Sequence, residues 1–263
     1  MMQTDIQSAL DAIVGHVTAL DHASGAGRIF ELFIMTSIAQ GLRNAHFSVW
    51  VQRSDGSIIH PGDPDRRFIQ RGGAPTGVAP ASDGPENASV IGFRRENGPA
   101  WEIWNGIQFA GRSAATHEID ISIVPASVGA ALRVHGGIPF GRPRVAIECK
   151  DVRTAGSLDE MRAFIARLYD VTLLRAHHRH LTFPDVRALH PGSPNTPRHR
   201  ATVTYWQENR RTRNIIARRT GFTSGTAPLG EYHRVEGHRD IDVGSSTLDE
   251  LVFSVVNWAA QNA

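Results

Sequence analysis

The spacing of apolar residues divides the chain into helical and strand-like stretches. Apolar residues recur at intervals of three and four over 4–20, 28–43 and about 158–174, which predicts three amphipathic helices. A closing helix is expected over 247–260. Apolar and polar residues alternate over 47–51, 117–124, 145–152 and 201–206, which predicts strands, and 214–218 forms a further short segment. Residues 90–93 and 101–104 are expected to form a hairpin around Glu96-Asn97-Gly98.

This order of elements indicates one α/β domain, 1–263, in which helices flank a mixed β-sheet. Its core is expected over about 28–175. Residues 53–115 are interpreted as a long decorated insertion before the first acidic strand, because 53–89 is rich in Gly, Pro, Asp and Ser. Residues 176–263 are interpreted as a C-terminal extension with a strand and the terminal helix.

Two strands carry acidic residues on one face. Side chains alternate between the two faces of a strand. In the first strand, one face is apolar and the other polar: Ile119, Ile121 and Ile123 against Glu118, Asp120 and Ser122. In the second strand, one face holds Val145, Ile147 and Cys149, and the other holds Ala146, Glu148 and Lys150. If the strands are neighbours with their polar faces aligned, Asp120, Glu148 and Lys150 converge.

Lys150 is the only lysine of the chain, among 28 basic residues. A lysine ammonium is a compact charge whose pKa can move, whereas a guanidinium is planar and always charged. The carboxylates of Asp120 and Glu148, the main-chain carbonyl of Cys149 and water would suit Mg²⁺, which keeps several waters and few protein ligands. The metal would polarise a phosphate oxygen and acidify a bound water, and Lys150 would orient that water or neutralise developing charge.

These residues resemble the motif of the PD-(D/E)xK nuclease superfamily, an acid on one strand followed by acid-x-lysine on the next. The matching positions are Asp120 and Glu148-Cys149-Lys150; the proline often found before the first acid is absent, and Glu118-Ile119 stand there instead. The resemblance covers about 28–175. It implies a restriction-endonuclease-like fold, with a four-stranded mixed sheet flanked by helices, and an endonuclease that cuts DNA with Mg²⁺, or with Mn²⁺ as a substitute.

The family often adds an acid from the helix that precedes the sheet, and Glu31 stands at that place, in the expected first turn of its helix. Two interpretations of Glu31 are open: contact with the metal shell, or a favourable charge at a helix N-terminus. An arginine-rich set is interpreted either as the lining of a nucleic-acid groove or as solvated surface. This set comprises Arg210, Arg211, Arg213, Arg218 and Arg219.

The resemblance favours a setting in restriction or anti-phage defence, and a homo-oligomer, because one site cuts one strand at a time. Two alternatives are an effector nuclease that a ligand or partner protein activates, and a catalytically inert DNA-binding subunit on the same fold. Arg-rich and polar residues over 176–235 motivate the first alternative. The intact set of two acids and a lysine argues against the second.

Composition adds limits on the environment of the protein. The net charge is only +2, but 13 histidines and a pI near 9.1 make the surface mildly basic, which permits a polyanionic partner. The single cysteine, Cys149, excludes an internal disulfide and suits a reducing cytoplasm. No stretch approaches the roughly 18 apolar residues of a membrane span, and no signal-peptide pattern opens the chain. A soluble cytoplasmic protein without membrane contact is expected.

Overall fold

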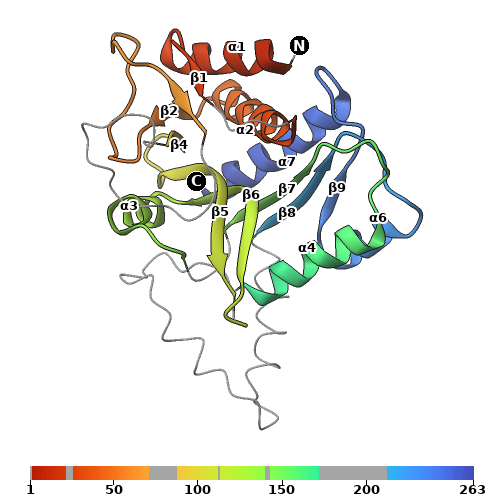
Figure 1. The fold of residues 1–263 in the computed structure, drawn as a ribbon. Helices are drawn as coiled ribbons and strands as arrows, with labels where there is room; N and C mark the ends of the chain where they lie inside the picture. The colour runs from red at the N-terminus through yellow and green to blue at the C-terminus, as the bar shows by residue number, and fades with distance from the viewer. Residues whose placement is uncertain (1, 22–25, 71–87, 112, 140–142, 172–211) are drawn as a thin grey trace.

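The computed structural model describes residues 2–21, 26–70, 88–111, 113–139, 143–171 and 212–263, and these build one seven-stranded mixed sheet with helices on both faces (Figure 1). The sheet order is β2-β4-β5-β6-β7-β8-β9. Neighbours from β2 to β7 are antiparallel, and β7, β8 and β9 are parallel. The bounds of its strands are β2 Ser48–Gln52, β4 Val90–Arg94, β5 Trp101–Ala110, β6 Thr116–Pro125, β7 Val145–Lys150, β8 Arg213–Arg218 and β9 Glu236–His238. A separate parallel pair joins β1 (Leu20–Asp21) to β3 (Phe68–Ile69).

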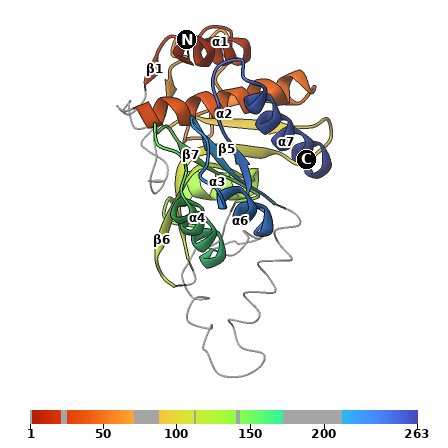
Figure 2. The ribbon, with the colours of Figure 1, turned by 90° about the vertical axis from the view of Figure 1, so that its right-hand side faces the viewer.

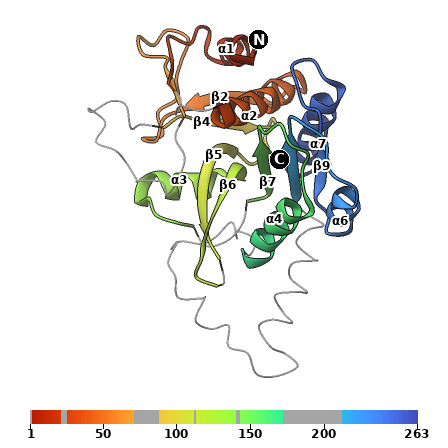
Figure 3. The same cartoon turned by 45° about the vertical axis from the view of Figure 1, so that its right-hand side comes forward.

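Helices form a layer on each face of the sheet (Figures 2 and 3). One layer consists of α1 (Met2–Val14), α2 (Ala26–Asn44) and α7 (Ser246–Asn262). The other consists of α3 (Ala126–His135), α4 (Leu158–Asp170) and α6 (Thr226–Tyr232). Among the described residues, no helix is both long and apolar enough to cross a lipid bilayer.

Each layer buries its own apolar cluster against the sheet. The α2/α7 core includes Phe30, Ile34, Ile38, Leu251 and Val255, packed with Ile121, Val145 and Ile147 of the sheet. The α4 core includes Val128, Leu132, Met161, Phe164 and Leu168, packed with Ile119, Ala146 and Ile216. Strand β7 contributes alternate residues to the two cores, as the period of a strand requires.

The four helices expected from apolar spacing correspond to α1, α2, α4 and α7. The expected end of the first helix at residue 20 is wrong, because α1 ends at Val14 and Leu20 belongs to β1. The strands expected at 47–51, 117–124 and 145–152 correspond to β2, β6 and β7, and the segment 214–218 is β8. The hairpin of β4 and β5 is confirmed by the pairing of Phe93 with Trp101. The expected strand 201–206 lies outside the described residues.

The expected core, insertion and extension all contribute strands to one sheet. Within 53–115, strands β4 and β5 are interior strands of the sheet. Within 176–263, strands β8 and β9 extend the same sheet, and α7 covers it. Nearly every residue of β5 from Trp101 to Ala110 is buried, so its polar residues do not mark a solvent-facing side.

The three isoleucines of β6 do not share one environment, contrary to expectation. Ile121 and Ile123 pack in the α2/α7 core, whereas Ile119 packs in the α4 core. The change occurs at Asp120, beside Gly106 of β5, whose φ of 62° lies in the left-handed region that favours glycine. The β5–β6 hairpin therefore changes its packing partners at the level of the candidate acid.

Candidate active site

The site begins where the pairing of β6 with β7 ends. The last register pair is Ile121 with Ile147, so Asp120 and Glu148 stand just beyond the ladder. There the Asp120 carboxylate replaces a main-chain acceptor: the Cys149 N–H donates to Asp120 Oδ2 at 2.7 Å. The N–H and C=O of one strand residue point to the same side, so the Cys149 carbonyl also points into this gap.

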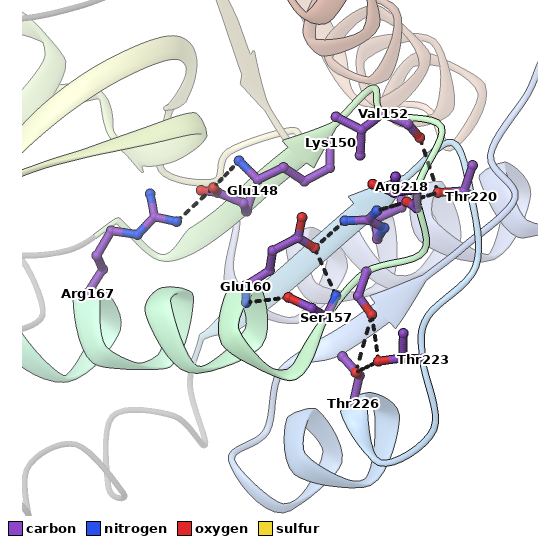
Figure 4. A network of polar contacts seen from close by, with 12 residues as sticks. Glu148, Lys150, Val152, Ser157, Glu160, Arg167, Arg218, Thr220, Thr223 and Thr226 are labelled. Carbon is purple, nitrogen blue, oxygen red and sulfur yellow. Dashed lines mark hydrogen bonds and ion pairs between the residues drawn. The ribbon is translucent and has the colours of Figure 1, made fainter.

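Glu148 is a buried carboxylate whose two oxygens differ in their hydrogen-bond partners. The residue is only 2% exposed. Its Oε1 lies 2.5 Å from Lys150 Nζ and 2.7 Å from Arg167 Nη2, which reaches it from α4 (Figure 4). Its Oε2 is buried and has no hydrogen-bond partner among the described residues. Buried polar atoms normally have a partner, so Oε2 is the oxygen of Glu148 that could accept a hydrogen bond or contact a cation.

Glu31 reaches the same region from α2. Because α2 begins at Ala26, Glu31 lies in the second turn of the helix, and the expected place in the first turn is wrong. Asn105 of β5 donates to Glu31 Oε2 at 2.8 Å and to the main-chain oxygen of Asp120 at 3.0 Å. Arg28 Nη1 lies 2.9 Å from the same Glu31 oxygen, and its Nη2 lies 3.3 Å from Glu118.

The sequence does not predict that Asn105 and Arg167 belong to the site. Asn105 is one of three polar residues in β5, with Glu102 and Gln108, so the pattern of the strand does not single it out. Arg167 lies on the helix that follows Lys150 in the chain, but 27 other basic residues offered no reason to select it.

The acids of the site disturb one another. Burial raises the pKa of Asp120 from its ordinary value to about 7, together with the charges of Glu148 and Glu31, against the opposing Cys149 N–H and Lys150. Burial also raises the pKa of Glu31, although Asn105 and Arg28 oppose the shift. Burial lowers the pKa of Lys150, but Glu148 and Asp120 outweigh it and the net pKa is raised, so the ammonium stays charged. At Asp120 and Glu31, burial and the neighbouring carboxylates therefore outweigh the nearby positive charges.

These groups fit a hard divalent cation in donor chemistry. Among the described residues, no three His, Cys, Asp or Glu side chains cluster as a metal-binding group by themselves. Mg²⁺ does not need three, because it is usually held by one or two carboxylates with waters completing the octahedron. Asp120, Oε2 of Glu148 and the Cys149 carbonyl supply oxygen donors. The Cys149 thiol is buried in the α2/α7 core, and burial raises its pKa well above the ordinary value.

The arginines proposed for a nucleic-acid groove fall in different places. Arg218 is 0% exposed and cannot contact a phosphate, so its assignment to the groove is wrong. Arg213 is partly exposed but pairs in register with Val145, about 16 Å along the strand from the end at Lys150. Arg219 is partly exposed and its N–H donates to the Lys150 carbonyl. Arg210 and Arg211 lie outside the described residues.

Arg218 instead fixes the start of α4. Its guanidinium donates to Glu160 Oε2 and, at 2.5 Å, to the Thr154 carbonyl (Figure 4). Glu160 is also the third residue of a capping box with Ser157, which satisfies main-chain N–H groups at the helix start. The same helix thus has its first turn tied to the interior and its last turn, through Arg167, tied to Glu148.

Comparison with protein-family models, with curated proteins and with solved structures finds no match to this chain. The functional argument therefore depends on the geometry of the site.

Proposed function

We propose that this protein is a metal-dependent DNA endonuclease that hydrolyses phosphodiester bonds. The observation that carries the proposal is Glu148: a buried carboxylate with one oxygen held by two cations and the other without a partner among the described residues. Asp120 stands beside it with a raised pKa. Two acids and an ammonium at the end of a strand ladder are the groups that metal-assisted phosphodiester cleavage requires.

The arrangement of elements supports a restriction-endonuclease-like fold as part of the proposal. Strands β5, β6 and β7 form an antiparallel meander, and β8 lies parallel to β7. Helix α2 covers one face of these four strands and α4 covers the other. This arrangement is compatible with the four-stranded mixed sheet between helices that the sequence resemblance implies, and it supports that part of the proposal; β2, β4 and β9 extend the sheet further.

Each residue has a defined task in the proposed reaction. Asp120 and Glu148 would hold Mg²⁺ through their carboxylates, with the Cys149 carbonyl as a third donor and Glu31 at the edge of the shell. The bound metal supplies a Lewis acid for the phosphate oxygen and for water. Lys150 stays protonated and donates to the phosphate oxygens as negative charge develops on them. The buried walls of the site strengthen that interaction by excluding water.

The expected substrate is DNA, and the expected setting is restriction or another form of anti-phage defence in the cytoplasm. Arg219, which follows β8 and whose N–H donates to the Lys150 carbonyl, would contact the phosphate backbone. The described part of each chain forms one such site, so cutting both strands calls for two copies. The proposal therefore includes a homo-oligomer.

The test is a cleavage assay with supercoiled plasmid, linear DNA and RNA, each with Mg²⁺, with Mn²⁺ and with a chelator. Nicked and linear plasmid should form with either metal and should be absent with chelator. Lys150→Ala should leave only slow residual cleavage, while Arg162→Ala on the exposed face of α4 should cut like the wild type. Metal-independent cutting, or equal cutting by Lys150→Ala, would refute the proposal.

A further inference from the structure

Arg167 spans the gap between the two acidic strands. From the last turn of α4, its Nη2 lies 2.7 Å from Glu148 Oε1 on β7. Its Nη1 donates to the main-chain oxygen of Glu118 on β6 at 3.2 Å. The guanidinium thus bridges β6 and β7 just beyond their last register pair.

Two cations share one oxygen of Glu148, although a single carboxylate needs only one to balance its charge. The two cations, Arg167 and Lys150, differ in how many contacts hold them in place. Arg167 is held by a second bond to β6, and its guanidinium lies 5.6 Å from the centre of the Phe164 ring. Among the described residues, the Lys150 ammonium pairs only with Glu148, and its stem is flexible. Of the two cations, Lys150 is the one able to leave.

We propose that Arg167 is a positioning residue, which keeps Glu148 in its metal-binding orientation so that Lys150 can move to the phosphate. With Oε1 held by Arg167, Oε2 stays turned toward the metal whether or not Lys150 is bound. Without Arg167, Lys150 is the only cation left on Glu148, and it cannot serve the carboxylate and the phosphate at once. This inference rests on the proposed function.

The fold of α4 does not depend on Arg167. The helix buries Met161, Phe164 and Leu168, and its first turn is fixed by the Ser157 cap and the Arg218–Glu160 ion pair. An Arg167 substitution therefore tests the site more than the helix. Arg162, on the same helix, forms only an exposed pair with Asp159 and provides a matched control.

The first experiment measures single-turnover plasmid cleavage at saturating Mg²⁺. Arg167→Ala should be about 100-fold slower, the effect expected of misplacing a reacting group by about 1 Å. Arg167→Lys should recover about tenfold of that loss, and Arg162→Ala should stay within about twofold of wild type. The double variant Lys150→Ala/Arg167→Ala should be no slower than Lys150→Ala alone, because residues that act as a unit are not additive.

The second experiment measures Mn²⁺ binding by calorimetry without DNA. Arg167→Ala removes a positive charge beside the metal, so it should bind Mn²⁺ more tightly, by about tenfold even at the dielectric constant of bulk water, about 80. A merely structural role would give the opposite pattern, with weaker Mn²⁺ binding and a lower melting temperature. Tighter metal binding combined with slower cleavage is the signature of positioning.

The two experiments distinguish a failure of the proposed role of Arg167 from a failure of the nuclease proposal. Wild-type rates in Arg167→Ala, or additive losses in the double variant, would overturn the role of Arg167 and leave the nuclease proposal standing. Wild-type protein that binds Mn²⁺ but cuts no nucleic acid would refute the nuclease proposal. In that case the Mn²⁺ affinity alone decides whether Arg167 governs Glu148, and an unchanged affinity in Arg167→Ala would overturn it.

Discussion

Replacing Asp120 by asparagine should make the metal-free protein more stable at pH 8. The pKa of this buried carboxyl is raised from 3.8 to about 7 in the folded protein. A raised pKa means that the folded state binds the proton more tightly than the unfolded state, so stability falls as pH rises from about 4 to about 7. Above pH 7 the full cost of the buried charge is present. Asparagine carries no charge and can still accept from the Cys149 N–H.

The magnitude follows from the shift. A rise of about 3 units corresponds to about 4 kcal/mol at about 1.36 kcal/mol per unit, and relaxation of the site reduces this to about 2–4 kcal/mol. For a chain of this size, Asp120→Asn should therefore melt roughly 5–10 °C higher at pH 8 in a chelator. At pH 5 the folded wild type is largely protonated at Asp120, and the gain should shrink to about 1 kcal/mol.

The assay is thermal unfolding at pH 5 and pH 8, with chelator and with Mg²⁺. Mg²⁺ at about 100 times its dissociation constant should stabilise the wild type by about 2.7 kcal/mol at pH 8 and leave Asp120→Asn nearly unchanged. Asp159→Asn, at an exposed position on α4, is the control and should shift neither curve. A lower melting temperature for Asp120→Asn at pH 8, or an equal response to Mg²⁺, would refute the reasoning.

Further predictions address the other charged residues. Glu148→Gln should abolish cleavage and Mn²⁺ binding, seen by plasmid assay and calorimetry. Lys150→Arg should cut about 100-fold more slowly, because a planar fork cannot take the place of a compact ammonium; near-normal turnover would show that charge alone suffices. Arg218→Leu should lower stability by roughly 2–4 kcal/mol in denaturant unfolding, because Glu160 loses its buried partner; an unchanged midpoint would contradict the role of Arg218. Arg219→Gln should reduce the salt dependence of DNA affinity by about one counterion, whereas Arg213→Gln, at the far end of β8, should not.

The parts of the fold that the sequence predicts are those with a single buried face. Helices α2 and α4 and strand β6 each present apolar residues on one side and polar residues on the other. The spacing of apolar residues in the sequence therefore identifies each of these elements. Strand β5 is buried on both faces, so its polar residues do not mark a solvent-facing side. Its assignment to an insertion followed from the Gly-, Pro-, Asp- and Ser-rich stretch 53–89 before it. Strand β9 has only three residues, too few to show any period.

The site was predictable in its acids and its ammonium but not in its supports. Asp120, Glu148 and Lys150 follow from alternation along two strands, because alternation fixes which side chains share a face. Arg167 and Arg218 cannot be told apart by pattern, since each is one arginine among many. Only the packing of α4 shows that Arg167 binds Glu148 and that Arg218 is buried beneath the start of the helix.

The bond between Asp120 and the Cys149 N–H also limits which residues position 120 can accept. A residue at position 120 without an acceptor atom would leave an amide unmet inside the sheet, at a cost of about 1–3 kcal/mol. If a descendant of this chain loses the proposed activity by a change at this position, asparagine should therefore be favoured over alanine or valine. That substitution removes the negative charge but keeps the atom that accepts from the Cys149 N–H.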